Sequence, residues 1–105
     1  MQTTITCRHC EISEALRERA ITVVERLESV ASRPMEMTVV FDADGLALTA
    51  ELRLHVPRGE ILVAKGEAPD HRTALDRAEE KLRRQLERSS DRPRRTRSTP
   101  SKNSL

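Results

Sequence analysis

Aromatic side chains are nearly absent from this sequence, because Phe41 is the single one among 105 residues. The core of so short a chain must be aliphatic and small, which leaves little stability for a deep catalytic pocket. Three glycines are too few for most phosphate-cradling loops, and no nucleophile–base motif occurs. We therefore predict that the chain is not an enzyme and has no small-molecule substrate.

Long hydrophobic runs are also missing, since no apolar stretch approaches the roughly 20 residues that a membrane helix needs. The start, MQTTITCRHC, lacks the basic region followed by an apolar run that marks a signal peptide. We expect a soluble, cytoplasmic protein with no membrane partner.

Cysteine is scarce, with Cys7 and Cys10 as the only two. Without a secretion signal we do not expect a disulfide between them. A zinc site needs about four ligands, but His55 and His71 lie far from CRHC (7–10) and form no matching pair motif. A redox Cys-x-x-Cys motif normally begins a helix, whereas this one ends the first predicted strand. We therefore predict that the protein holds neither a metal nor a cofactor. A small Cys/His metal or redox protein remains the least favoured of three hypotheses for the function of this chain.

Basic residues are unevenly placed along the chain. Residues 88–105 carry six basic side chains against one acidic, a net charge of +5. Residues 1–87 carry 13 basic and 16 acidic side chains, a net charge of −3. A polyanion would therefore have to meet the body of the protein at a local basic patch.

Hydrophobic periodicity predicts six elements. They are a strand at 2–8, a helix from the N-cap Ser13 to about Ala31, strands at 35–42 and 48–56 joined by the turn Asp44-Gly45, an edge strand at 60–68, and a helix capped by Asp70 and ending near Ser89. The order β-α-β-β-β-α predicts an α+β domain at 1–89, a four-stranded sheet with two helices packed on one face and the other face open. A right-handed crossover would make the first strand parallel to the second. The composition of residues 90–105 predicts a basic, disordered tail.

Apolar stripes predict which side chains each element buries. The helical positions are Leu16, Ala20, Val23, Leu27 and Val30 in the first helix and Leu75, Ala78, Leu82 and Leu86 in the second. The strand positions are Met35, Met37, Val39 and Phe41, then Leu48, Ala50, Leu52, Leu54 and Val56.

Both predicted helices sort their charges by side. At about 100° per residue, four cations of the second helix fall within about 60° of each other: Arg77, Lys81, Arg84 and Arg88. Rows of Arg and Lys at helix-turn intervals can follow the regularly spaced phosphates of a nucleic acid. Arg19, Arg26 and Arg33 line one flank of the first helix. If the helices lie side by side, the two basic flanks could merge into one cleft.

The same pattern has a plainer interpretation, since charged helix faces are usually solvated and held by i,i+4 pairs such as Glu80 with Arg84. Periodicity alone leaves both interpretations open. No aromatic residues are interleaved for base stacking, so duplex or folded RNA bound by shape and phosphate fits better. The role of the tail is also undecided, since its cations could form a nucleic-acid-binding arm or only keep the protein in solution. They are Arg92, Arg94, Arg95 and Arg97.

An ordered set of segments resembles a known family. The segments are ITCRH (5–9), EISEALR (11–17), AELRLHVP (50–57), Asp70 with ALD (74–76), and KLRRQL (81–86). Together they resemble the ribosome hibernation-promoting factors, also called ribosome-associated inhibitors or sigma-factor modulation proteins. The likeness spans about residues 1–88 and implies a short form, because the C-terminal dimerisation domain of the long form has no counterpart here. We expect the free protein to be monomeric.

The resemblance implies a function as well as a fold. It implies binding to the small ribosomal subunit between head and body, where tRNA and mRNA would otherwise lie, so that translation stops under stress or in stationary phase. The rRNA contacts of the family come from both helices and correspond here to Lys81 and Arg84. To these we add Arg77 and Arg88, which lie on the same side of the second predicted helix, and also Arg8, Arg19 and Arg26.

A protein-interaction module is the second hypothesis. It would use the open face of the sheet to modulate another regulator. Its candidate contact residues lie on the clearest predicted strand: Thr49, Glu51, Arg53 and His55.

Overall fold

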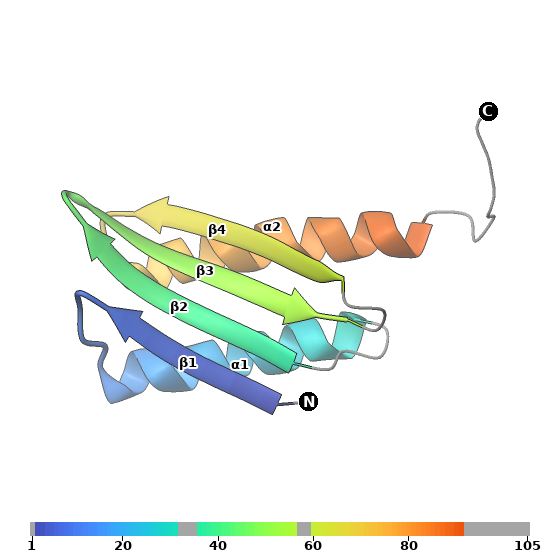
Figure 1. Ribbon diagram of the computed structural model, residues 1–105, viewed down its shortest axis with the longest axis horizontal. Coiled ribbons are helices and arrows are strands. Elements are labelled where there is room, and N and C mark those ends of the chain that lie inside the picture. Colours follow the sequence, from blue (N-terminus) through green and yellow to red (C-terminus); the bar gives the residue numbers. More distant parts are fainter. Residues whose placement is uncertain (1, 32–35, 57–59, 92–105) are drawn as a thin grey trace.

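The computed structural model describes residues 2–31, 36–56 and 60–91. The elements follow in the order β1 (Gln2–Arg8), α1 (Glu14–Val30), β2 (Glu36–Asp44), β3 (Ala47–His55), β4 (Ile61–Ala68) and α2 (His71–Asp91). The strands form one sheet in the order β1-β2-β3-β4 (Figure 1). This confirms the predicted β-α-β-β-β-α order and makes β4 an edge strand, as predicted.

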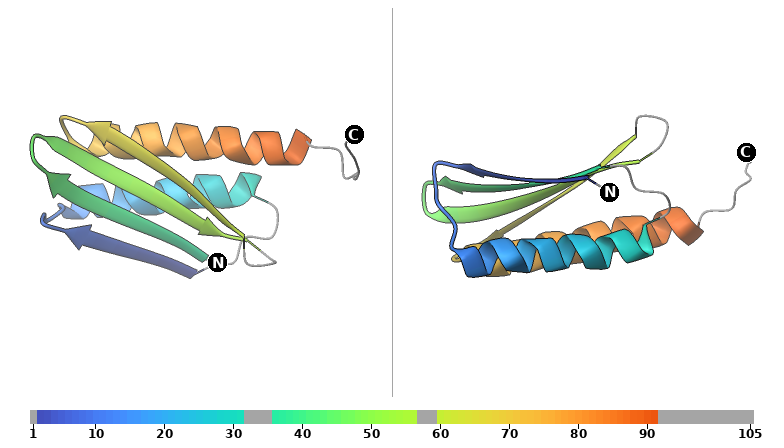
Figure 2. Two further views of the ribbon diagram at one scale, coloured as in Figure 1. Left: turned by 45° about the horizontal axis from the view of Figure 1, so that its top comes forward. Right: turned by 90° about the horizontal axis from the view of Figure 1, so that it is seen from below.

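The sheet is mixed. β1 pairs with β2 in parallel, with Ile5 opposite Val39, while β2–β3 and β3–β4 pair in antiparallel fashion. The parallel pair follows from the crossover through α1, which must carry the chain back along the sheet. Both helices cover the same face and run in the same direction, and the other face stays open (Figures 1 and 2).

Local signals explain where the helices begin and where the hairpin turns. Ser13 is the N-cap of α1, and its Oγ accepts a hydrogen bond from the Leu16 amide at 3.1 Å. Asp70 does the same for α2, accepting from the Thr73 amide at 2.8 Å. Gly45 in the β2–β3 turn has a φ of 65°, which glycine adopts without a steric cost. α2 ends at Asp91, so the helix continues two residues beyond its predicted end at Ser89.

An aliphatic core lies between the sheet and the helices, with Phe41 fully buried in it. Its other members include Ala20, Val23 and Leu27 of α1, Met37 and Val39 of β2, Ala50, Leu52 and Leu54 of β3, and Leu75, Ala78, Leu82 and Leu86 of α2. These burials confirm most of the predicted stripes, while Leu16, Leu48 and Val56 are half-buried and Met35 lies outside the described residues.

One predicted core position is wrong. Val30 is 41% exposed, and Val24 is buried in its place. At about 100° per residue, Val30 points roughly 70° from the mean direction of the buried α1 residues, and Val24 points roughly 50° from it on the other side, toward α2 and the sheet. Neither described helix is long and apolar enough to span a membrane.

Candidate nucleic-acid interface

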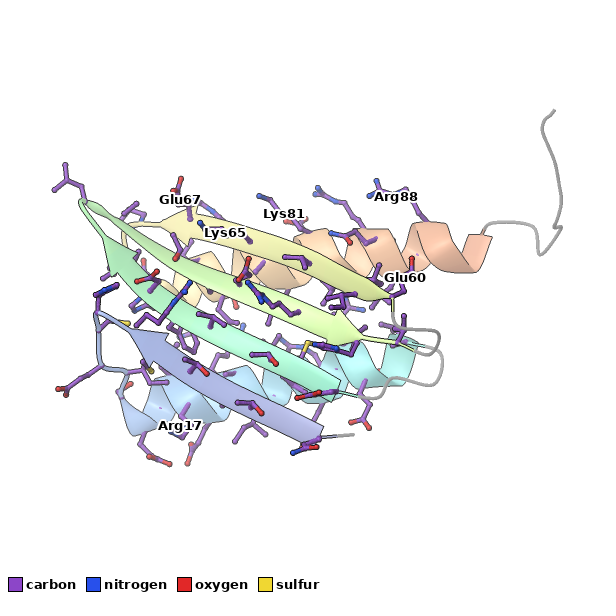
Figure 3. All side chains as sticks on the ribbon, viewed as in Figure 1. Arg17, Glu60, Lys65, Glu67, Lys81 and Arg88 are labelled. Atoms are coloured by element: carbon purple, nitrogen blue, oxygen red, sulfur yellow. The ribbon has the colours of Figure 1, made fainter. Side chains whose placement is uncertain are left out.

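The four cations predicted on one side of the second helix lie on the outer flank of α2, beside the free edge of β4. Arg77, Lys81, Arg84 and Arg88 are all exposed, and we call them the α2 basic row. Figure 3 shows Lys81 and Arg88 extending along the long edge of the molecule, with Arg17 of α1 on the opposite long edge. The row is therefore accessible along its length.

Two members of the row are held in place by the backbone of β4. Arg77 donates from Nη1 to the carbonyl oxygen of Glu67 at 2.6 Å, and Lys81 donates from Nζ to that of Lys65 at 2.8 Å. An arginine carries five N–H donors and a lysine three, so both keep donors for another partner. These carbonyls orient the cations without neutralising them.

Arg84 has a different environment. Its Nη2 lies 3.0 Å from Glu80 Oε2, and both side chains are more than half exposed. This confirms the predicted i,i+4 pair. Such exposed pairs contribute little free energy, so a phosphate could displace Glu80 from Arg84 at low cost.

The basic flank of α1 faces α2. Arg19 Nη2 donates to Asp76 Oδ1 at 3.0 Å. Arg26 makes a bidentate contact with Glu79, from Nε at 2.9 Å and from Nη2 at 3.0 Å. This hydrogen bonding to Glu79 raises the pKa of Arg26 above its usual value. Glu79 is only 8% exposed and also lies 3.4 Å from Arg83 Nη2.

The predicted merger of the two basic flanks into one cleft is therefore wrong. The side of α2 that faces α1 carries Asp76 and Glu79, which pair with Arg19 and Arg26. The α2 basic row points the other way, over the edge of β4. Opposite charges gather at the helix–helix contact because an unmatched cation there would lose solvation without a partner.

Arg8 lies apart from the row. It ends β1, which forms the opposite edge of the sheet from β4. Its Nη2 lies 3.6 Å from Asp42 Oδ2, and His9 Nδ1 lies 3.1 Å from Asp42 Oδ1. The hydrogen bond with His9 lowers the pKa of Asp42. The predicted site residues thus occupy three separate places, and the four tail arginines and Arg33 lie outside the described residues.

Sequence reasoning missed Gln85 and Glu79. Gln85 donates from Nε2 to the carbonyl oxygen of Val63 at 2.8 Å, which continues the contacts of Arg77 and Lys81. Its position four residues after Lys81 was the available signal. Glu79 lies next to the apolar stripe of α2, four residues after Leu75, which is an unusual position for an unpaired carboxylate.

A groove of about 510 Å³ opens between the beginnings of the two helices. It is lined by Arg19, Arg72, Glu18 and Asp70 among others. Cations and carboxylates are balanced there, so its charge favours neither an anion nor a cation. Within the described part of the chain, Arg19 Nε is buried without a hydrogen-bond partner.

The cysteines are free thiols, both half-buried. Burial raises the pKa of Cys10, and the neighbouring Cys7 acts in the same direction. A raised pKa keeps the thiol protonated and weakly nucleophilic near neutral pH. Among residues 2–31, 36–56 and 60–91, no three His, Cys, Asp or Glu side chains are grouped to hold a metal.

The open sheet face pairs its charges locally. On β3, Arg53 Nε donates to Glu51 Oε1 at 3.1 Å, Thr49 is 7% exposed, and His55 is half-buried. The candidate contact residues of the second hypothesis thus offer less free charge than the α2 basic row.

Comparisons with known proteins agree on one family. The family described as "Sigma 54 modulation protein / S30EA ribosomal protein" matches residues 3–94. The ribosome hibernation promoting factor of Salmonella typhimurium is 38% identical over 91 residues, which cover 87% of this chain and 95% of that protein. The corresponding factor of Pseudomonas putida is 32% identical over 88 residues, covering 84% and 85%.

Solved structures share the fold. The N-terminal domain of Thermus thermophilus Protein Y aligns with a TM-score of 0.72 and 26% identity, covering 85% of this chain and 99% of that chain. A ribosomal subunit interface protein from Coxiella burnetii aligns with a TM-score of 0.77 and 22% identity, covering 88% and 100%. The chain therefore belongs to the ribosome hibernation promoting factor family, whose members are non-enzymatic, ribosome-associated regulators of translation.

Proposed function

We propose that this protein binds the small ribosomal subunit through contacts between its α2 basic row and rRNA, and thereby inhibits translation under stress or in stationary phase. By occupying the sites of tRNA and mRNA it would act as a competitor and not as a catalyst. The observation that carries the proposal is the exposed row of four cations on one flank of α2, in a chain of this family.

The geometry of the row suits a phosphate backbone. From Arg77 to Arg88 the row extends over about 16 Å of helix, at about 1.5 Å per residue. Cations at helix-turn intervals along this length can contact successive phosphates and release their counterions. Because β4 carbonyls already orient Arg77 and Lys81, less side-chain entropy is lost when RNA binds.

Contacts to phosphate and shape fit the composition better than base stacking does. The single aromatic side chain, Phe41, is fully buried, so it cannot stack on a base. Arginine adds bidentate contacts to phosphate that lysine cannot make. In this proposal Arg8, Arg19 and Arg26 contribute less, because their carboxylate partners are less exposed than Glu80, the partner of Arg84, and are harder for a phosphate to displace.

The test is co-sedimentation with small subunits across a salt series. The Lys81→Glu/Arg84→Glu variant should lose ribosome binding, and any residual binding should depend on salt with a slope smaller by about two phosphate contacts. Arg17→Glu/Arg53→Glu is the matched control, since it changes the net charge equally at exposed positions away from the row. The control should bind nearly as the wild type does.

Unchanged sedimentation of the Lys81→Glu/Arg84→Glu variant would show that the row is not the interface. Equal loss in both variants would point to net charge alone. A single stoichiometric protein recovered from RNase-treated lysate would instead favour the protein-interaction module. Truncation after Asp91, which keeps α2 whole, separates the contribution of Arg92, Arg94, Arg95 and Arg97 from that of the row.

A further inference from the structure

Three side chains of α2 close the free edge of β4. Arg77, Lys81 and Gln85 donate to the carbonyl oxygens of Glu67, Lys65 and Val63, at 2.6, 2.8 and 2.8 Å. The donors are four residues apart on the helix, and the acceptors are two residues apart on the strand.

The regularity has a geometric cause. Four residues of α-helix rise about 6 Å, and two residues of strand rise about 6.6 to 6.8 Å. α2 runs antiparallel to β4 along this contact, as the descending acceptor numbers require. The two spacings nearly match, so one flank of the helix can serve successive outward carbonyls of the strand.

An uncovered edge of this kind is a site for strand addition. β3 pairs with one side of β4, and among the residues that the structure describes no strand pairs with the other side. Unpaired strand edges associate with other chains unless something blocks them. The N–H and C=O of one residue point to the same side of a strand, so Val63, Lys65 and Glu67 present both groups outward.

We infer that Arg77, Lys81 and Gln85 keep this edge closed, and that the partner they exclude is β4 of a second copy of the chain. Two antiparallel copies of β4 can place Lys65 of each copy opposite Glu67 of the other. A two-fold axis then produces this pair twice, and opposite charges directly across two strands are favourable. The Val63 side chain, which is 44% exposed, would be partly buried by the paired strand.

Edge closure does not depend on the proposed ribosome binding. Arg77 and Lys81 use one donor each on β4 and keep others, so one side chain can do both. The experiment is therefore made on purified protein without nucleic acid, and its failure would leave the proposed function untouched.

The test is sedimentation equilibrium of the Arg77→Ala/Lys81→Ala/Gln85→Ala variant. Removing the three donors should strengthen self-association by about tenfold or more, equivalent to about 1.4 kcal/mol. Arg84→Ala/Arg88→Ala is the matched control, because it removes two cations from the same helix, and Arg84 pairs with Glu80 and not with β4. The control should keep the wild-type mass.

Adding Lys65→Pro to the triple variant should restore the wild-type mass. Proline removes the outward amide and the ammonium group that pairing of two β4 strands would use, while the ladder to β3 stays intact. If the triple variant proves unfolded by circular dichroism, Lys81→Ala alone, which opens the central carbonyl, decides the question. A folded variant with the wild-type mass at every concentration, or a control that associates equally, would overturn the inference.

Discussion

Glu79 is a carboxylate with 8% exposure between the two helices, where it accepts both hydrogen bonds of Arg26 and lies near Arg83. The Arg26 side chain is 42% exposed, so the pair is only half-buried, and breaking it should cost less than breaking a fully buried ion pair. The residue therefore acts on stability and helix placement, and it does not face the α2 basic row.

We expect Glu79→Gln to lower the free energy of unfolding by about 1 kcal/mol, since the amide has one acceptor oxygen in place of two and gives the half-exposed guanidinium of Arg26 no counter-charge. Urea denaturation measures the loss. The neighbouring Glu80→Gln is the control. Its side chain is 66% exposed, so the change should stay within about 0.5 kcal/mol. Equal losses at both positions would contradict the role given to Glu79.

Asp70 makes the free energy of unfolding depend on pH. The Thr73 amide, and next its hydroxyl, hydrogen-bond the ionised carboxylate and lower the pKa of Asp70. A lowered folded-state pKa means that this stabilisation is complete above the unfolded value of about 3.9. It is lost as the pH falls through the folded pKa.

We therefore expect the free energy of unfolding to fall as the pH drops below about 4, and to fall less in Asp70→Asn. Asparagine still accepts the Thr73 amide as an N-cap but does not titrate. Urea midpoints between about pH 7 and about pH 2 measure the difference. Asp42, whose pKa is also lowered, titrates in both proteins and cancels. Identical acid profiles would show that Asp70 contributes nothing.

At the scale of the elements, the contact of α2 with β4 decides where the basic row lies. Gly66 of β4 lies directly against α2: a Cβ there would overlap the carbonyl oxygen of Ala74 and lie 2.8 Å from the amide nitrogen of Ala78. Both neighbours are backbone atoms, so no side chain can turn away to make room. The absence of a side chain at Gly66 is what lets Arg77 and Lys81 reach the carbonyls of β4.

Gly66→Ala should therefore push α2 away from the sheet and lower the free energy of unfolding by about 1 to 3 kcal/mol. Glu67→Ala is the control, because it shortens an exposed side chain on the same strand and should change stability by less than about 0.5 kcal/mol. Thermal and urea unfolding measure both. A neutral Gly66→Ala would mean that the helix moves without cost and that the close approach is not required.

On the scale of the whole molecule, charges of both signs are sorted in space and not only along the chain. Residues 1–87 have more acids than bases, yet α2 presents cations at its outer flank and carboxylates to α1. The molecule can therefore offer a polyanion one positive edge without being strongly basic as a whole. Residues 1–87 have a net negative charge, so a polyanion must bind them at a local basic patch, and the outer flank of α2 provides one.

The elements themselves could be predicted because their signals are local. Alternation identifies β2 and β3, and the apolar stripe of α2 was placed correctly at Leu75, Ala78, Leu82 and Leu86. The N-caps at Ser13 and Asp70 could also be predicted, because each is a capping residue directly before an apolar stripe. Val30 shows the limit, because a residue at the margin of a stripe is buried or exposed according to where the helix meets the sheet.

The order of elements, the aliphatic core and the three- and four-residue spacing of cations on α2 follow from the sequence alone, since backbone periodicity and side-chain polarity act over neighbouring residues. Tertiary structure alone decided which way each charged flank faces. The rotation of α2 follows from its close contact at Gly66 and from the ion pairs with Arg19 and Arg26. These contacts join residues far apart in the chain, so no local pattern could separate the α1 cations that pair with α2 from the α2 cations left for a partner.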